Sequence, residues 1–201
     1  MAVLAAGGAY GALPESLSVG PAWVLPVIVV VLAIPTTIAH RQGAHRLNMV
    51  LGHLSSAILT GFVLWSTVLL VAALPAHREP PVSLLTSAVT LWLTNVLVFA
   101  LWYWRLDAGG PHARDSRDRH EVGAFLFPQM TLTGPAACEP EGDPWSPRFV
   151  DYLFMAFTTS TAFSPTDVPV LSRWAKLLVM TQSIISLVVI AVLAARAVNI
   201  L

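Results

Sequence analysis

Charged side chains are scarce in this sequence: the 11 basic and 11 acidic residues make up only 11% of its 201 residues, and their formal charges cancel. Soluble domains carry about 25% charged residues. This scarcity, with 56% hydrophobic residues and a mean hydropathy of +0.71, predicts an integral membrane protein in contact with lipid. Because the chain has no strong overall charge, its composition does not indicate a nucleic-acid partner, and we expect none.

Cysteine is nearly absent, because Cys138 is the only one. A single thiol excludes an intramolecular disulfide and any metal site built from several cysteines. His40, His45 and His53 are more simply explained as interfacial or inter-helix side chains than as ligands, so we expect neither a metal nor a resident cofactor. His53 falls within an apolar run, where a titratable group can confer pH sensitivity.

Acidic residues are missing from every long apolar run. An intramembrane hydrolase needs a nucleophile with a partnered base. Ser55 and Ser56 follow His53 too closely on one helix to form such a pair, and no acid in the run can orient the imidazole. We therefore expect no enzyme activity. Asn95, in the middle of another apolar run, is interpreted as a packing contact between helices.

Four apolar runs are long enough to cross a bilayer as helices, which takes about 20 residues. They cover residues 22–39, 47–74, 82–104 and 174–198. The connections between the first three runs are short and predict antiparallel neighbours. Residues 1–21 lack a basic region typical of a cleaved signal peptide, and are expected to be a mobile tail or an interfacial segment.

A long charged connection, residues 105–146, follows the third run. A loop of that length is either functional or disordered. Its alternating charges at positions 114–119 are most simply explained as a solvated turn or short helix.

A shorter apolar run, residues 147–158, precedes the last long one. A helix of about a dozen residues is about 18 Å long, which is roughly half the membrane. Ser146 is suited to cap this helix, with Pro147 in its first position. Because non-helical backbone at membrane depth is tolerated only inside protein or beside water, the pattern predicts a re-entrant helix and loop.

Hydroxyl groups gather where this short helix should end, at Thr158, Thr159, Ser160 and Thr161. The C-terminal end of a helix carries a partial negative charge. Oxygens without a formal charge suit monovalent cations that have lost part of their water shell. The segment therefore predicts a cation pathway.

The same run resembles the pore region of the tetrameric cation channels, especially the potassium channels. That family has an outer helix, a pore helix, a Thr-Thr-x-Gly-Tyr-Gly-Asp filter and an inner helix with Arg or Trp near its start. Residues 159–164 would overlie the filter, with Phe163 at the aromatic position and Ala162 and Ser164 in place of the two glycines. Asp167 follows the filter, and Arg173 and Trp174 sit near the start of the last helix.

The resemblance implies an all-α integral membrane protein with four transmembrane helices and a re-entrant pore helix and loop before the last one. Two peripheral helices would occupy residues 22–81. The pore domain, residues 82–201, would contain an outer helix 82–104, the loop 105–146, a pore helix 147–158, a filter-like loop 159–168 and an inner helix 172–199.

The implied function is passive conduction of monovalent cations by a homotetramer in lipid. Without the glycines a cage of backbone carbonyls is costly, so hydroxyls or waters would line the narrow region and selectivity would be weak. The expected ion pathway consists of Thr158, Thr159, Ser160, Thr161, Ala162, Phe163, Ser164 and Asp167. Asp167 would attract cations or brace the loop at the mouth.

The last helix carries a stripe at spacings of three to four residues, which one helix face presents together. Its members, Ser183, Ser186, Ile190 and Leu193, are expected to face the central axis. Ile190 and Leu193 would form an apolar gate that closes by excluding water.

Basic residues flank the runs mainly on one side, in the segments 41–46, 105–119 and 173–176. The positive-inside rule then places the N-terminus outside and the re-entrant loop on the cytoplasmic face of a plasma or bacterial inner membrane. The family's pore loop enters from the other side. Two other functions fit the pattern: a non-conducting membrane scaffold or accessory subunit, and a small-solute transporter.

Overall fold

The computed structural model describes residues 2–11, 13, 21, 23–41, 43–76, 80–117, 122–132, 145–165 and 167–198. Within these ranges every regular element is a helix, and the β-pairing is an isolated bridge between Phe125 and Val170. The predicted all-helical class is therefore confirmed. Cys138, the middle of the predicted loop 105–146 and the last residues of the predicted inner helix lie outside the described residues.

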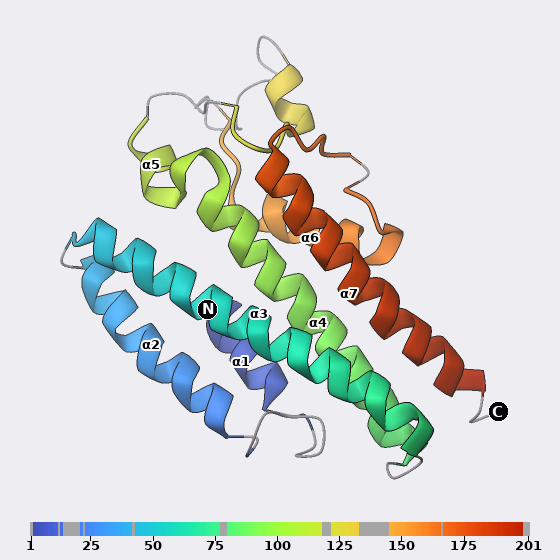
Figure 1. Cartoon of the computed structure of the whole chain (residues 1–201). Coiled ribbons are helices and arrows are strands. Elements are labelled where there is room, and N and C mark those ends of the chain that lie inside the picture. The colour runs from blue at the N-terminus through green and yellow to red at the C-terminus, as the bar shows by residue number, and fades with distance from the viewer. Residues whose placement is uncertain are drawn as a thin grey trace.

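Long helices form the body of the protein (Figure 1). They are α2 (Val24–Arg41), α3 (His45–Ala76), α4 (Pro81–Leu106) and α7 (Arg173–Val198). Three apolar stretches are long enough to span a membrane: His45–Ala73, Val82–Gly109 and Arg173–Ala195. The stretch in α2, Val24–Ala39, is shorter, so the described structure shows three helices of spanning length where the sequence predicted four.

Helix α4 is the centre of the fold, between α3 on one side and α7 on the other (Figure 1). Of the residues in its apolar 18-residue window 61% are buried, whereas the share in the corresponding windows of α3 and α7 is 33% each. Pro81 occupies the first turn, where a missing N–H costs nothing, and Asp107 caps the C-terminal end in an extended conformation. From this central position α4 contacts α1 and α3 as well as α6 and α7.

Most of the described N-terminal residues are helical, so the expectation of a mobile tail is wrong for residues 2–10. Residues Ala2–Tyr10 form helix α1, which packs against α2 and α4, with Ala6 and Tyr10 buried. The Tyr10 hydroxyl shares a 2.5 Å hydrogen bond with Ser66 Oγ of α3. The small side chains of this segment allow the close approach, since a Cβ at Gly7 would lie 3.0 Å from the Val29 methyl groups.

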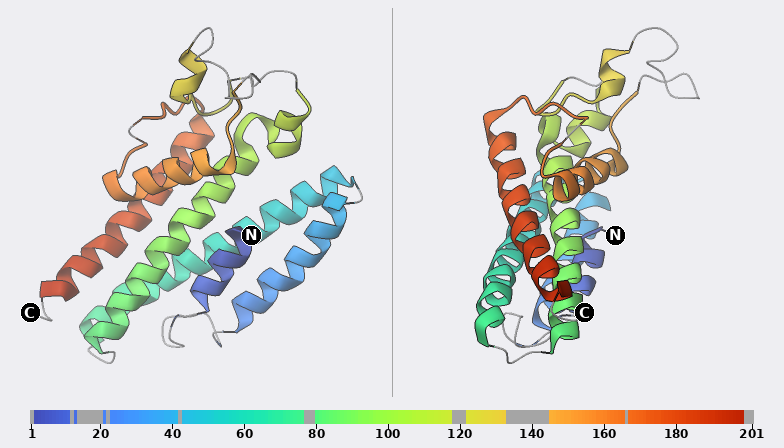
Figure 2. Two further views of the ribbon diagram at one scale, coloured as in Figure 1. Left: turned by 180° about the vertical axis from the view of Figure 1, so that it is seen from behind. Right: turned by 90° about the vertical axis from the view of Figure 1, so that its right-hand side faces the viewer.

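Helix α6 (Phe149–Ala162) crosses α4 and α7 near the end where α4 stops and α7 begins (Figure 2). It begins two residues later than predicted because the Arg148 backbone N–H donates to Asp151 Oδ2 at 2.7 Å, which makes Arg148 the cap. It ends four residues later than predicted, at a left-handed Phe163 with φ 57°. The hydroxyls of Thr158 and Thr161 donate to carbonyl oxygens of their own helix. These polar side chains therefore do not end the helix.

Short segments close the end of the bundle beside α6. They are η2 (Asp107–Gly109), α5 (Pro111–Asp115) and η3 (Pro128–Thr131). The backbone of Leu126 donates to Pro169 O at 3.0 Å, and Leu171 donates to Ala124 O at 2.8 Å. These bonds fix the chain before α7 to the connection that follows α4.

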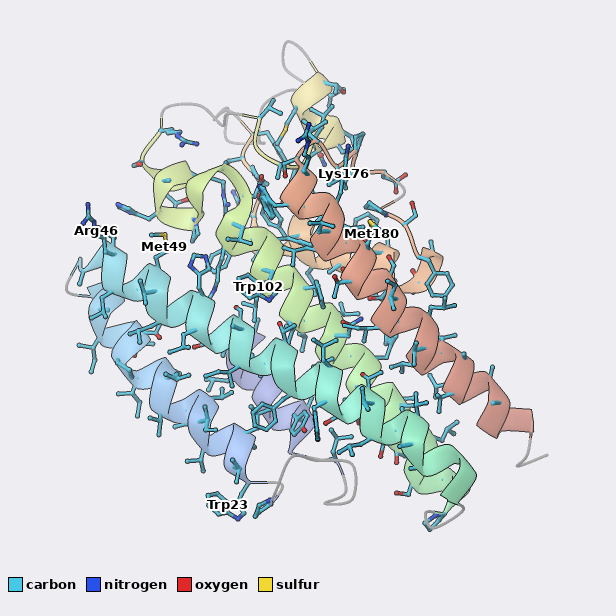
Figure 3. The ribbon with its side chains drawn as sticks, in the orientation of Figure 1. Trp23, Arg46, Met49, Trp102, Lys176 and Met180 are labelled. Carbon is cyan, nitrogen blue, oxygen red and sulfur yellow. The ribbon has the colours of Figure 1, made fainter. Side chains whose placement is uncertain are left out.

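The two ends of the bundle differ in their side chains. Arg46 and Lys176 lie toward the end that carries α5, and Trp23 lies toward the other (Figure 3). The same end of the molecule carries the last turn of α2, the first turn of α3, the last turn of α4 and the first turn of α7 (Figure 1). The basic flanks seen in the sequence therefore share one end of the molecule.

Candidate functional site

A single buried amide, Gln182 on α7, joins three helices. Its Nε2 donates to Ala156 O at 2.7 Å and to Ser160 Oγ at 2.8 Å, both on α6. Its Oε1 accepts from the Tyr103 hydroxyl of α4 at 2.5 Å. Gln182 has no exposed surface. The amide thus fixes the C-terminal half of α6 against the two helices beneath it.

Asn95 of α4 extends this polar network along α7. Its Nδ2 donates to Ser186 Oγ at 2.8 Å and to Gln182 O at 3.3 Å. Nearer the tip of α6, Trp92 Nε1 donates to Ser160 O at 3.4 Å. Hydrogen bonds of this kind hold membrane helices together where water is absent. Asn95 is therefore the inter-helix contact that the sequence predicted.

The C-terminal end of α6 lies well along α7. Gln182 is nine positions after Arg173, the first residue of α7, which corresponds to about 14 Å along the helix axis. The next residue, Ser183, donates from its hydroxyl to Phe163 O at 3.2 Å. The chain then returns to the start of α7 through residues 164–172.

The two faces of α6 have different surroundings. One face is buried against α4 and α7 through Tyr152, Met155, Ala156, Thr159 and Ser160. The opposite face is exposed in the single chain and is apolar, with Val150 63%, Phe154 54% and Phe157 47% exposed. Beyond it the tip of α6, residues 161–164, is exposed as well.

The predicted pathway residues do not share one surface. Because successive residues of a helix point about 100° apart, Thr158 to Thr161 cannot all face one passage. Thr159 and Ser160 have no exposed surface, and Thr158 is half-buried with its hydroxyl bonded to Met155 O. Only Thr161, Ala162, Phe163, Ser164 and Asp167 are exposed.

The predicted stripe on α7 is also placed differently. Ser186 is fully buried within the chain and bonded to Asn95, so it does not face open space. Ser183, Ile190 and Leu193 are half-buried. The exposed face of α7 consists of residues that the sequence analysis did not select: Leu177, Met180, Ile184 and Leu187. The orientation of α7 is set by the buried polar side chains on its other face.

A second buried polar cluster holds the N-terminal half of α6. The Asp107 carboxylate is fully buried and accepts from the Tyr152 hydroxyl at 2.7 Å and from the Ala124 backbone N–H at 2.6 Å. Arg114 is only 4% exposed, and its Nη1 donates to the backbone oxygens of Trp104 and Asp107. The prediction of a solvated segment was wrong for Arg114, because the end of α4 supplies its acceptors.

The Asp107 cluster changes the acidity of Tyr152. Burial, and then the neighbouring Asp107 carboxylate, raise the pKa of Tyr152 well above its ordinary value of about 10. The ring also packs edge-on against Phe127 at 5.2 Å, and the Arg114 guanidinium lies 5.1 Å from its centroid. Tyr152 at one end and Gln182 at the other therefore hold α6 firmly in place.

Among the residues that the structure describes, no group of three or more His, Cys, Asp or Glu side chains could hold a metal ion. No protein-family model matches this chain, and neither a curated protein nor a solved structure is similar enough to match it. The geometry of α4, α6 and α7 is therefore the basis for assigning a function.

Proposed function

We propose that this protein is a passive, weakly selective channel for monovalent cations, formed by four copies of the chain. The observation that carries the proposal is the position of the α6 tip. It ends beside Gln182, partway along α7, with its hydroxyl-bearing last turn exposed. An ordinary connection between two spanning helices would stay at the membrane surface.

The depth of α6 supports a re-entrant segment. The apolar stretch of α7 has 23 residues, or about 34 Å, and the hydrocarbon core of a bilayer is about 30 Å thick. A tip about 14 Å below the start of α7 would lie close to the middle of the membrane. Helix α2, with 18 residues and about 27 Å, would be the fourth span.

The chemistry of the tip supports a cation as the permeating species. The Thr161 hydroxyl proton is directed to Phe157 O and Thr158 O of its own helix, at 3.0 and 3.2 Å. A hydroxyl oxygen keeps acceptor lone pairs when its proton is donated. Thr161 would therefore present oxygen lone pairs at the end of a helix, where the partial charge is negative.

One chain cannot surround a pathway with one tip, so the proposal requires several copies. The exposed apolar faces of α6 and α7 would contact lipid and neighbouring copies. Around a fourfold axis the four tips would form a ring of Thr161, Phe163 and Ser164 oxygens. Asp167 would lie at the mouth, and the half-buried Ile190 and Leu193 would narrow the passage farther along α7 as an apolar gate.

The test is ion flux through the purified full chain in liposomes. A channel passes potassium, sodium and rubidium down their gradients, with rates that keep rising at millimolar concentrations. Saturation at low concentration would identify a transporter instead. Flux equal to that of protein-free liposomes would contradict conduction. The remaining function would then be that of a scaffold or accessory subunit.

A further inference from the structure

A hollow of about 620 Å³ lies between α4 and the helices α2 and α3 that precede it. It is enclosed by the C-terminal end of α2, the N-terminal turns of α3, the end of α4 and the η2–α5 segment. Figure 3 shows Arg46 and Met49 of this region at the start of α3, close to α5. None of the residues that line the hollow belongs to the proposed ion pathway.

The lining of the hollow is cationic. Arg46 and Arg105 contribute to it together with the imidazoles of His45, His53 and His112, and none of its lining residues is acidic. A concave surface lined by one sign of charge concentrates ligands of the opposite sign. The expected ligand is therefore an anion.

The Arg105 guanidinium points to a missing acceptor. Its Nη1 is buried and has no hydrogen-bond partner among the described residues. His53 Nε2, in the same lining, is buried and unpartnered as well. A buried N–H without an acceptor is unfavourable, and buried polar groups are normally bonded to protein, water or an ion. An anion in the hollow would supply the acceptor.

Gly52 of α3 makes the space in which Arg105 sits. A Cβ at position 52 would overlap Arg105 Nη1 and would lie 2.7 Å from its Cζ. The guanidinium thus packs directly on the α3 backbone. Any larger residue at position 52 would occupy the space that the guanidinium now fills. The guanidinium therefore packs against helix α3 and does not extend over an open surface.

The rim of the hollow adds further polar groups. The rings of His45 and His112 are stacked with their centroids 3.4 Å apart and their planes 8° apart, and both side chains are exposed. Their nitrogens can donate to a ligand that enters between α3 and α5. The site lies at the end of the apolar stretches, the level at which lipid headgroups meet a membrane protein.

We propose that this hollow binds a negatively charged phosphate group, carried by a lipid headgroup or free in solution. A guanidinium matches phosphate oxygens with two parallel hydrogen bonds, and it remains charged at all physiological pH values. Basic hollows between transmembrane helices on the cytoplasmic side bind such headgroups. Arg105 would be the buried contact and Arg46 the exposed one.

The experiment compares two glycine substitutions in the same helix. Gly52→Ala keeps every charge but displaces the flexible Arg105 guanidinium, and alanine is a better helix former than glycine. Gly61→Ala is the matched control, because a Cβ there meets nothing within 4 Å. Phosphate binding is measured by calorimetry on the full chain in detergent, and lipid retention by native mass spectrometry with phosphatidylglycerol or phosphatidylcholine.

We expect Gly52→Ala to weaken binding of the phosphate-bearing probe about tenfold, while Gly61→Ala binds as the unchanged chain does. Saturable binding of inorganic phosphate that displaces lipid identifies free phosphate as the ligand. Retention of phosphatidylglycerol over phosphatidylcholine without phosphate binding identifies a headgroup. Equal binding by the two glycine variants, or an unchanged chain that binds neither probe, would overturn the proposal.

A second pair of variants keeps the test decisive if Gly52→Ala does not fold. Arg105→Gln removes the buried charge, and Arg173→Gln removes an exposed charge at the same end of the molecule and outside the hollow. We expect Arg105→Gln alone to lose binding. A loss of the same size in Arg173→Gln would show that the attraction is only non-specific, and would overturn the site.

Discussion

The Gln182 side-chain amide donates to the backbone oxygen of Ala156 at 2.7 Å, which fixes α6 partway along α7, a helix long enough to span a membrane. The same Nε2 also donates to Ser160 Oγ, and Oε1 accepts from Tyr103. Every hydrogen-bonding group of this amide is used inside the chain. The depth of α6, and hence the proposed pathway, depends on this residue.

Replacing Gln182 with leucine should destabilise the chain by about 1–2 kcal/mol. The Tyr103 hydroxyl loses its acceptor, and inter-helix hydrogen bonds in membrane proteins contribute about 0.6 to 1.7 kcal/mol. The measurement is unfolding in a titration of denaturing detergent. Thr181→Val is the control, since the Thr181 hydroxyl bonds only Leu177 O of its own helix. If the two substitutions lower the free energy of unfolding equally, Gln182 does not hold α6 against α4 and α7.

Replacing Thr161 with valine should reduce the cation flux or change the order of preference among potassium, sodium and rubidium. The change removes one oxygen per copy from the proposed ring and leaves the helix backbone in place. Thr86→Val is matched closely, because Thr86 is exposed and its hydroxyl bonds two carbonyl oxygens of its own helix in the same manner. Flux of potassium, sodium and rubidium into liposomes is the readout. A Thr161→Val protein indistinguishable from Thr86→Val would exclude the hydroxyl ring.

The pH dependence of stability should reflect Tyr152. Since burial and Asp107 raise its folded-state pKa above about 10, its contribution is complete below pH 10 and is lost as the pH rises through the folded-state pKa. The free energy of unfolding should therefore fall in alkaline solution. In Tyr152→Phe this fall should be smaller, with a lower stability at neutral pH because the bond to Asp107 is gone. Parallel alkaline profiles of the two proteins would contradict the assignment.

Much of the fold could be predicted from the sequence. Long apolar runs predicted α3, α4 and α7 to within a few residues, because in lipid every backbone group must be bonded inside the helix. Helix α1 was not predicted, since its Gly- and Ala-rich residues have no apolar periodicity and fold against α2 and α4 through small side chains.

The site was harder to predict because its contacts join distant parts of the chain. Asp107 looks like a solvated loop charge until Tyr152 and Ala124, which are remote in sequence, are brought beside it. Arg114 is buried because it donates to backbone oxygens at the end of α4. Gln182 could have been predicted as a contact between helices. Burying an amide in the middle of an apolar run is unfavourable unless the amide is hydrogen-bonded. The hydroxyl cluster was found, but the helix divides it between two faces.

The orientation of the chain has its own test. In a chain with Cys138→Ser, a cysteine at the exposed Ser116 should resist a membrane-impermeant thiol reagent in intact cells, because the basic end is expected inside. A cysteine at Trp23, which is 64% exposed and at the other end, should react. The reverse pattern would show that the loop enters from outside.

The most direct measurement is an electron-microscopy structure of the purified full chain in lipid nanodiscs. The account predicts four copies around one axis, with residues 161–164 of each copy facing a water-filled passage. A single copy, or an assembly in which the α6 tips face lipid with no passage beside them, would contradict it.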